Sequence, residues 1–421
     1  MKLITAVVHG GGTGPSPEGG HGMRVQRRSL ALAALVGLCL TAPGMLRAQS
    51  GAPTPVDSAA KKPDPPPPPV NHLETALAGF KLTGYAAGSY AYSGRSSGDT
   101  AIVGRLYDRL QNRFMLNALA VVLDKPYDPA KFSAGFHTEL LVGQDATVIQ
   151  SGGFNLGSQA DLPHLYVTLN VPTASGNGLQ FKVGRIPTLL GLEVIETVAN
   201  PSLSEGNQFI YVENFTGTGL SVETKFNNYV DLQLRVINGW DQVSDNNSHK
   251  SFMGRVGLYP DALTSLGIVG YWGAEEPGNN SANRYGFEGL LWRKLGKAAV
   301  WVQGDYGTEQ ANAALPDPTQ DAKWWALGGW VTYDFSTTLG LALRGDYVND
   351  ENGARTNGAF GYPAAPVNVG QKFGSGTATL NIRAWPGAVV RPEVRYDRST
   401  LQAFAGKKDQ VTVALGVAYL Y

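Results

Sequence analysis

The sequence predicts an all-β fold in which about sixteen strands close into an antiparallel transmembrane β-barrel, with short turns at one end and long loops at the other. Three observations carry this prediction: the composition, a recurring strand pattern and the lengths of the connections. The 421 residues include 53 glycines, 18 tyrosines and 8 tryptophans, which favour strands and tight turns over helices. After residue 48 no stretch approaches the ~18 consecutive apolar residues of a membrane helix, so a helical membrane protein is excluded.

Residues 1–48 have the three parts of a secretory signal. Three arginines stand within Arg24–Arg28, Leu30–Leu40 is almost wholly apolar, and Ala48 offers a small residue for cleavage. The apolar stretch is shorter than the ~20 residues needed to span a bilayer. Met23 is an alternative start, because the Gly- and Pro-rich residues before it have no role in a signal. We therefore expect an exported protein.

Residues 49–79 are predicted to form a linker in the periplasm, because the run Pro65–Pro69 favours extended polyproline II over a packed element. The single cysteine, Cys39, lies within the signal, so the exported chain has no disulfide. That chain keeps 29 basic and 33 acidic residues, and this near balance argues against a nucleic-acid partner.

Residues 80–421 are predicted to form the barrel itself. Segments of roughly ten residues with alternating apolar and polar positions recur along this region, which is the length that a tilted strand needs to cross a membrane. Sixteen segments fit this pattern, in residues 80–92, 112–123, 132–143, 163–171, 179–185, 215–225, 230–240, 251–259, 264–273, 283–293, 298–307, 324–335, 338–349, 375–384, 389–397 and 410–421.

The connections between these segments alternate in length. Short ones, such as 226–229 and 336–337, often carry turn residues, whereas the intervening ones, such as 144–162 and 351–374, are longer and polar. A soluble β-sandwich or propeller would not sort its loops by parity in this way. The alternation therefore predicts a bacterial outer-membrane barrel with an even number of strands and both termini in the periplasm.

Alternation within the strands assigns an outer and an inner face. In segment 230–240, Val and Leu occupy even positions, while Asp231, Gln233 and Arg235 occupy odd ones. A charged side chain facing lipid near the midplane would cost roughly 2–4 kcal/mol, so the charged positions must line a wet interior. The predicted pore-lining residues are Lys81, Arg113, Lys182, Arg235, Arg255, Arg344, Asp346, Arg383, Arg391, Glu393 and Arg395.

The final segment, Val411–Tyr421, has an apolar residue at every second position and ends on an aromatic. An unpaired backbone amide in hydrocarbon costs several kcal/mol, so this strand must pair on both edges, and we expect it to close the barrel against 80–92. Aromatic residues at strand ends are predicted to form girdles at the membrane interfaces. They are Trp240, Tyr259, Trp272, Tyr333, Phe335, Tyr347, Trp385, Tyr419 and Tyr421.

One connection, residues 186–214, differs in composition from the other loops. It is long and moderately apolar, and it contains four glutamates but no Lys or Arg. Two readings are open: a surface loop with solvated carboxylates, or a loop folded into the barrel as a constriction, opposite inward arginines. Opposed charges across a narrow waist would order water and reject apolar solutes. The glutamates are Glu193, Glu196, Glu205 and Glu213, and the arginines are Arg344, Arg383, Arg391 and Arg395.

Several motifs resemble the β-barrel porins of the OmpL-like group, and the resemblance covers the barrel and is sharpest over residues 179–260. It implies an outer-membrane pore with an inward constriction loop, a C-terminal aromatic presented to the barrel-insertion machinery, and a homotrimer. The chain is also similar to phosphate-selective porins, but it lacks the dense lysine ladder of a phosphate channel. The motifs are Val183-Gly184-Arg185, Gly191-Leu192-Glu193, Phe215-Thr216-Gly217-Thr218-Gly219, Asn238-Gly239-Trp240-Asp241 and Asp245-Asn246-Asn247.

We expect passive diffusion of small hydrophilic solutes or ions through a water-filled pore in the outer membrane, without a cofactor, metal or catalytic site. Ion preference stays open, because inward basic and acidic residues nearly balance. A non-conducting surface anchor or adhesin is the alternative and would require a plugged lumen. A barrel hydrolase is less favoured, because His137 and His164 fall on the inner face and His249 has no nucleophile motif beside it.

Overall fold

In the computed structural model the predicted barrel region is described almost completely. The predicted signal, the alternative start at Met23 and most of the predicted linker lie outside the described residues. Within the described part of the chain, no helix combines the length and the apolar character needed to cross a bilayer. The structure describes residues 73–74, 79–95, 101–174, 176–356, 359 and 369–421.

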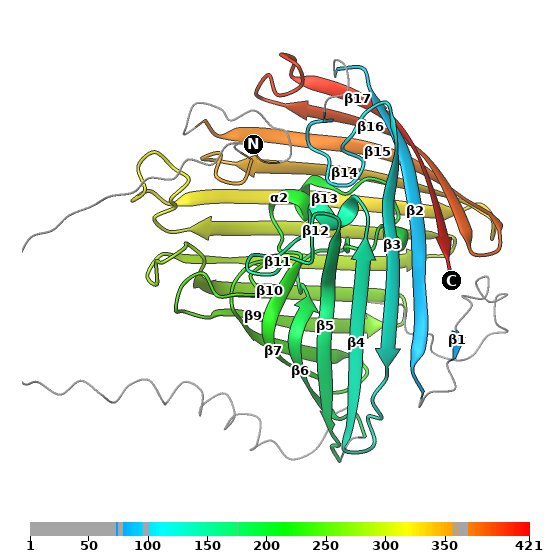
Figure 1. The fold of residues 1–421 in the computed structure, drawn as a ribbon, viewed down its shortest axis with the longest axis vertical. Coiled ribbons are helices and arrows are strands. Elements are labelled where there is room, and N and C mark those ends of the chain that lie inside the picture. The colour runs from blue at the N-terminus through cyan, green and yellow to red at the C-terminus, as the bar shows by residue number, and fades with distance from the viewer. Residues whose placement is uncertain (1–72, 75–78, 96–100, 175, 357–358, 360–368) are drawn as a thin grey trace, which may run out of the picture. The chain divides into compact units, whose positions relative to one another are not determined.

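Sixteen strands, β2 to β17, form a closed antiparallel barrel (Figure 1). Each pairs with its neighbours in the sequence, and the last closes the wall on the first, from Thr412 opposite Ser93 to Leu420 opposite Tyr85. A two-residue strand, β1, lies within the predicted linker and pairs with the first residues of β2. The predicted fold class and the strand number are confirmed. The strands are β1 (Leu73–Glu74), β2 (Lys81–Ser93), β3 (Arg113–Lys125), β4 (Ser133–Val142), β5 (Ala160–Val171), β6 (Leu179–Pro187), β7 (Thr216–Lys225), β8 (Val230–Ile237), β9 (Ser251–Asp261), β10 (Thr264–Ala274), β11 (Asn283–Leu295), β12 (Ala298–Glu309), β13 (Ala322–Asp334), β14 (Leu339–Asp350), β15 (Gln371–Trp385), β16 (Ala388–Ser399) and β17 (Asp409–Leu420), and the short helices are η1 (Asp145–Thr147), η2 (Thr197–Ala199) and α2 (Asn207–Tyr211).

The connections keep the predicted alternation of length. One end of the barrel, the turn end, carries tight connections such as 262–263 and 386–387. The other end, the loop end, carries long ones such as 188–215 and 351–370. Both the first barrel strand and the last thus have their free ends at the turn end, as an even number of strands requires.

The outer surface follows from the period-two pattern. In β17, Val411, Leu415 and Tyr419 are each about half exposed, whereas Thr412 and Ala418 are buried. This alternation places apolar side chains toward lipid and small ones toward the interior.

Closure of the barrel depends on a glycine beneath the C-terminal aromatic. Gly84 and Tyr421 exchange two backbone hydrogen bonds of 3.1 and 3.0 Å, and the Tyr421 hydroxyl donates to the Ala120 carbonyl at 2.9 Å. A Cβ at Gly84 would lie 2.1 Å from that carbonyl oxygen and 2.6 Å from Tyr421 Oη. The Tyr421 side chain therefore requires glycine at position 84.

Two predicted girdle residues face inward instead. Trp240 is buried against the Tyr271 ring, with centroids 5.1 Å apart. Tyr259 donates its hydroxyl to the inward-facing Asp231 at 2.5 Å. Trp240 lies beyond the end of β8, where the strand alternation no longer applies, and Tyr259 has the inward parity of β9. The predicted girdle residues that are exposed are Trp272, Tyr333, Phe335, Tyr347, Trp385 and Tyr419.

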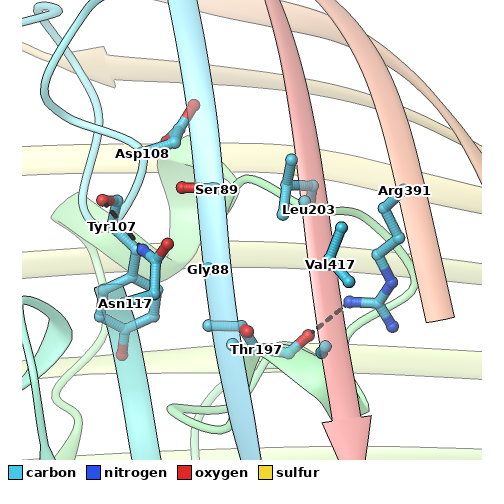
Figure 2. A pocket seen from close by; sticks show the side chains of 12 residues that line it. Gly88, Ser89, Tyr107, Asp108, Asn117, Thr197, Leu203, Arg391 and Val417 are labelled. Carbon is cyan, nitrogen blue, oxygen red and sulfur yellow. Dashed lines mark hydrogen bonds between the residues drawn. The ribbon is translucent and has the colours of Figure 1, made fainter. Parts of the chain in front are cut away.

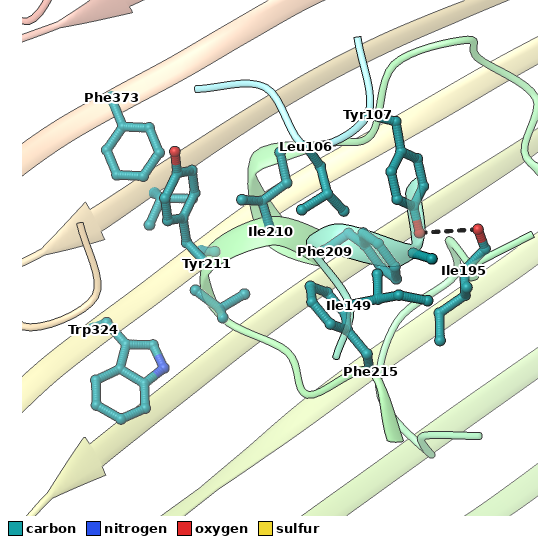
Figure 3. Packing of buried hydrophobic residues seen from close by; sticks show 14 of the residues in the cluster. Leu106, Tyr107, Ile149, Ile195, Phe209, Ile210, Tyr211, Phe215, Trp324 and Phe373 are labelled. Atoms are coloured by element: carbon teal, nitrogen blue, oxygen red, sulfur yellow. Dashed lines mark hydrogen bonds between the residues drawn. The ribbon is translucent and has the colours of Figure 1, made fainter. Parts of the chain in front are cut away.

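A cluster of buried apolar side chains lies inside the barrel around α2. Phe209, Ile210 and Tyr211 pack with Leu106 and Tyr107 of the loop that follows β2 (Figure 3). The Tyr107 hydroxyl donates to the Ile195 carbonyl at 3.1 Å. Part of the lumen is therefore filled by loops that share a hydrophobic core rather than by water alone.

Candidate functional site

The connection between β6 and β7, residues 188–215, lies inside the barrel, and we call it the inner loop. It contains η2 and α2, and α2 is seen within the ring of strands in Figure 1. Its backbone and side chains bond to inward residues of β11, β12 and β14 to β16, on the wall across from β6. Composition alone left a surface loop and an inward loop as alternatives, and the structure places the loop inward.

Glu193 of the inner loop forms a buried ion pair with Arg344 of β14. The Arg344 Nη1 lies 2.7 Å from Glu193 Oε1, and neither side chain is more than 2% exposed. Glu193 also accepts a hydrogen bond of 2.6 Å from the Gly206 amide, across the loop itself. This single carboxylate thus holds two parts of the inner loop against the wall.

Other predicted pore-lining residues hold the same loop by its backbone. Glu393 accepts hydrogen bonds from the amides of Leu203 and Ser204, at 2.7 and 3.2 Å. Arg391 donates to the carbonyls of Thr197 and Val198, at 2.7 and 3.0 Å, and the first of these bonds is drawn in Figure 2.

Two further predicted residues bind α2 and the residues before it. Arg395 donates to the Glu205 carbonyl at 2.5 Å, while Asp346 accepts from the Asn207 amide at 3.0 Å and from its side chain at 2.6 Å. Charge-assisted hydrogen bonds of this kind are roughly twice as strong as neutral ones. Polar side chains of β14 and β16 therefore hold the inner loop against the barrel wall.

Two of the loop glutamates are buried without a cationic partner. Both carboxylate oxygens of Glu205 lack a hydrogen-bond partner among the described residues. Burial, and then repulsion from Glu193, raises the pKa of Glu205 well above its ordinary value. Burial and the nearby Asp305 likewise raise the pKa of Glu213, which accepts a 2.6 Å hydrogen bond from Gln303. Burial therefore favours the neutral form of both carboxyls.

Glu196 has the opposite environment. Burial disfavours its charged form, but hydrogen bonding and attraction from His164 of β5 outweigh burial and lower the pKa of Glu196 to about 2. The two side chains approach to 3.2 Å. Of the four glutamates predicted to charge a constriction, Glu193 and Glu196 are the ones in contact with cationic or imidazole groups.

The remaining predicted pore-lining residues lie away from the inner loop or beside it. Lys182 pairs with Glu223 at 2.8 Å, and Arg235 approaches the same carboxylate at 3.6 Å. Arg255 pairs with Asp231 at 2.8 Å. Three predicted residues are more exposed than the others: Lys81 and Arg113 at the first positions of their strands, and Arg383, whose side chain is 39% exposed beside Asp334 near the turn end.

A second loop, residues 101–112, also enters the lumen, and sequence patterns did not clearly predict it. In residues 101–112, Arg105 pairs with Asp397 of β16 at 2.8 Å and with Asp108 at 3.2 Å. The side chain of Arg105 is fully buried. Ile102 and Leu106 in a loop expected to be polar are the one signal in the sequence that could have indicated it.

Two cavities remain beside the inner loop, and the linings of both lie toward the turn end. The turn-side cavity, of about 460 Å³, is lined by Asn200, Asp334, Arg383 and Arg391 among others. The β4–β11 cavity, of about 280 Å³, lies between the inner loop and β4 to β11, and its lining includes His164 together with Arg255 and Ser265 toward the turn end.

A third cavity, of about 20 Å³, separates the inner loop from β2 and β17 (Figure 2). It has room for about one water molecule. The space that remains beside the inner loop thus consists of cavities of very different size.

The closed barrel, the long loops at one end and the charged interior define the class of this protein as an outer-membrane β-barrel porin. Residues 79–421 match the family described as "Putative beta-barrel porin-2, OmpL-like", and the chain belongs to that family. The resemblance found in the sequence motifs is thereby confirmed. A comparison with curated protein sequences found no match.

Solved porin structures share the fold at low sequence identity. The outer membrane channel DcaP of Acinetobacter baumannii is 12% identical over 82% of this chain and 97% of its own, with a TM-score of 0.54. An anion-selective porin from Comamonas acidovorans is 12% identical over 81% and 99%, with a TM-score of 0.57. The trimer form of OmpT, an outer membrane protein of Vibrio cholerae, is 10% identical over 81% and 99%, with a TM-score of 0.53.

Proposed function

We propose that the barrel admits small hydrophilic solutes and ions by passive diffusion along the polar spaces beside the inner loop. The observation that carries the proposal is the wall of these spaces, where ionised and hydrogen-bonding side chains from the strands and the loop face two cavities of about 460 and 280 Å³. A charged wall needs water, and it rejects apolar solutes because they offer nothing to replace that water. The narrow spaces favour small solutes over large ones.

The turn-side cavity favours anions. Arg391 is buried there and donates to two carbonyls and to the Asn381 side chain, without a carboxylate partner among the described residues. Its positive charge is therefore not cancelled locally, and it attracts anions into the cavity. The fold similarity to the anion-selective porin of Comamonas acidovorans supports the same preference.

Recording in a planar bilayer tests the proposal. Protein that circular dichroism shows to be folded should give stepwise current increases, and a salt gradient should give a reversal potential of the sign expected for anions. Folded protein that inserts and gives no steps would refute conduction, while a cation-selective potential would refute the role assigned to Arg391.

The location and assembly complete the proposal. Residues 1–48 act as the export signal, residues 49–79 form a spacer, and the turn end with both ends of the barrel faces the periplasm. The C-terminal Tyr421 is presented to the insertion machinery, and three barrels associate, as the trimer form of OmpT does. A channel is favoured over a hydrolase, because within the described part of the chain the side-chain bonds of His164 and His137 go to carboxylates. Chemical crosslinking in the membrane tests the trimer.

A specific observation favours a second candidate function, a non-conducting surface anchor. The apolar cluster around α2 and residues 101–112 fills part of the lumen toward the loop end. If this cluster seals the pore, the bilayer recording gives no steps from folded protein, and deletion of residues 101–112 opens it. The same recording therefore separates the two functions.

A further inference from the structure

Three side chains with metal-ligating atoms meet where the inner loop touches the barrel wall. Glu139 of β4 and His164 of β5 stand directly opposite each other across the two strands. Glu196 of the inner loop approaches from the lumen. The His164 Nδ1 lies 3.4 Å from Glu139 Oε2 and 3.2 Å from Glu196 Oε1. The three potential ligand atoms lie within 4.8 Å of one another.

These distances suit a metal ion. Zinc is bound tetrahedrally, with Zn–N and Zn–O distances of about 2.0–2.2 Å, so two of its ligand atoms are about 3.3–3.6 Å apart. The two distances from His164 Nδ1 are close to that separation. Two carboxylates and one imidazole would leave the fourth position to water from the adjoining cavity.

Hydrogen bonding alone leaves this cluster incompletely satisfied. A neutral imidazole carries a proton on one ring nitrogen only, so Nδ1 offers at most one proton to the two carboxylates. Among the described residues, Glu139 Oε1 and His164 Nε2 are buried without a hydrogen-bond partner. Glu139 is only 1% exposed and His164 only 4%, so solvent does not make up for the missing partners.

The charge of the cluster also calls for a cation. Among the ion pairs of the described residues, Glu139 and Glu196 have His164 as their shared partner. Lys182 and Arg235, which line the same cavity, are engaged with Glu223 instead. The buried Glu139 carboxylate and the partly exposed Glu196 carboxylate thus face one imidazole, while the β4–β11 cavity of about 280 Å³ gives an ion a route to His164 and Glu196.

We propose that Glu139, His164 and Glu196 form a site for a divalent transition-metal ion, with Zn²⁺ as the best-fitting probe, and that the bound ion joins the inner loop to the barrel wall. Imidazole favours Zn²⁺ over Mg²⁺ and Ca²⁺, which prefer oxygen ligands throughout. The ion adds to the loop a connection to β4 and β5, on the side of the barrel across from the Glu193–Arg344 pair.

Titration calorimetry of the full chain in detergent, with ZnCl₂ and in parallel with MgCl₂, tests the site. We expect one Zn²⁺ per chain and at least about tenfold weaker binding of Mg²⁺. His164→Gln and Glu196→Gln should each weaken Zn²⁺ binding by at least about tenfold. Glu196→Gln is the decisive variant if His164→Gln does not fold, because residue 196 lies in the loop and not in the wall.

The matched control is His137→Gln. His137 is also an inward histidine, on β4, but among the described residues its Nδ1 contacts one carboxylate, that of Asp124, at 3.2 Å. This variant should bind Zn²⁺ as the parent does. Hydrogen exchange tests whether the bound ion joins the inner loop to the barrel wall. Zn²⁺ should slow exchange of amides 194–200 in the parent and not in Glu196→Gln. The proposal is overturned if the parent binds no Zn²⁺, or if Glu196→Gln binds it unchanged.

Discussion

Replacing Glu193 by Gln should loosen the inner loop from the barrel wall. The substitution removes the negative charge that lies 2.7 Å from the fully buried Arg344, and breaking a buried ion pair from one side costs about 3–5 kcal/mol. Arg344 keeps Asp346 at 3.6 Å, so we expect the lower end, about 3 kcal/mol. At 1.4 kcal/mol for each factor of ten, this is roughly a hundredfold rise in the population of detached loop.

Hydrogen exchange measured by mass spectrometry on the folded protein is the assay. Amides 203–207, which bond to Glu393, Glu193 and Asp346, should lose about two decades of protection in Glu193→Gln. Asp334→Asn is the control, because its pair with Arg383 is 61% and 39% exposed and is worth about 0–1 kcal/mol. Protection of the loop within threefold of the parent would refute the role given to the Glu193–Arg344 pair.

Three further predictions follow from the wall, the turn-side cavity and the buried carboxyls. Gly84→Val should lower the folded yield, because its Cβ would lie 2.1 Å from the Ala120 carbonyl oxygen, whereas Gly345→Val, with nothing within 4 Å, should fold as the parent does in circular dichroism. Arg391→Gln should shift the reversal potential toward cations, and no shift would show that this guanidinium does not face permeating ions. Burial raises the pKa of Glu205 in the folded state above its ordinary value of 4.5. The free energy of unfolding is therefore highest below pH 4.5, and it falls as the pH rises toward the folded-state pKa. Glu205→Gln should therefore raise the unfolding temperature at pH 8 and leave it nearly unchanged at pH 4, and equal shifts at both values would contradict the buried protonation.

The wall of the barrel could be predicted from sequence because each strand obeys a local rule. Lipid on one side and water on the other force alternation in every strand, so Val411 to Tyr419 identify their faces without knowledge of their neighbours. The alternation of short and long connections then indicates that consecutive strands are antiparallel neighbours in the barrel. The exceptions lie where the rule stops: Trp240 follows the end of β8, and its side chain turns into the interior.

The lumen could be predicted only in part, because its contacts join residues far apart in the chain. Arg344, Arg383, Arg391 and Arg395 were expected to face the loop glutamates. Among the described residues only Arg344 pairs with one, whereas Arg383 pairs with Asp334, and Arg391 and Arg395 bind loop carbonyls. Nothing in local composition distinguishes a carboxylate that accepts a proton, such as Glu205, from one that pairs, such as Glu193. That difference depends on which wall residues each one reaches after the loop has folded.

Permeation of solutes of graded size tests the central claim most directly. Liposomes that contain the folded protein would be placed in isotonic solutions of sugars from pentoses to trisaccharides, and their swelling followed by light scattering. We predict rapid swelling with the smallest sugars and a steep decline with size, because the spaces beside the inner loop are narrow. Liposomes that contain folded, inserted protein and exclude even pentoses would contradict a diffusion channel.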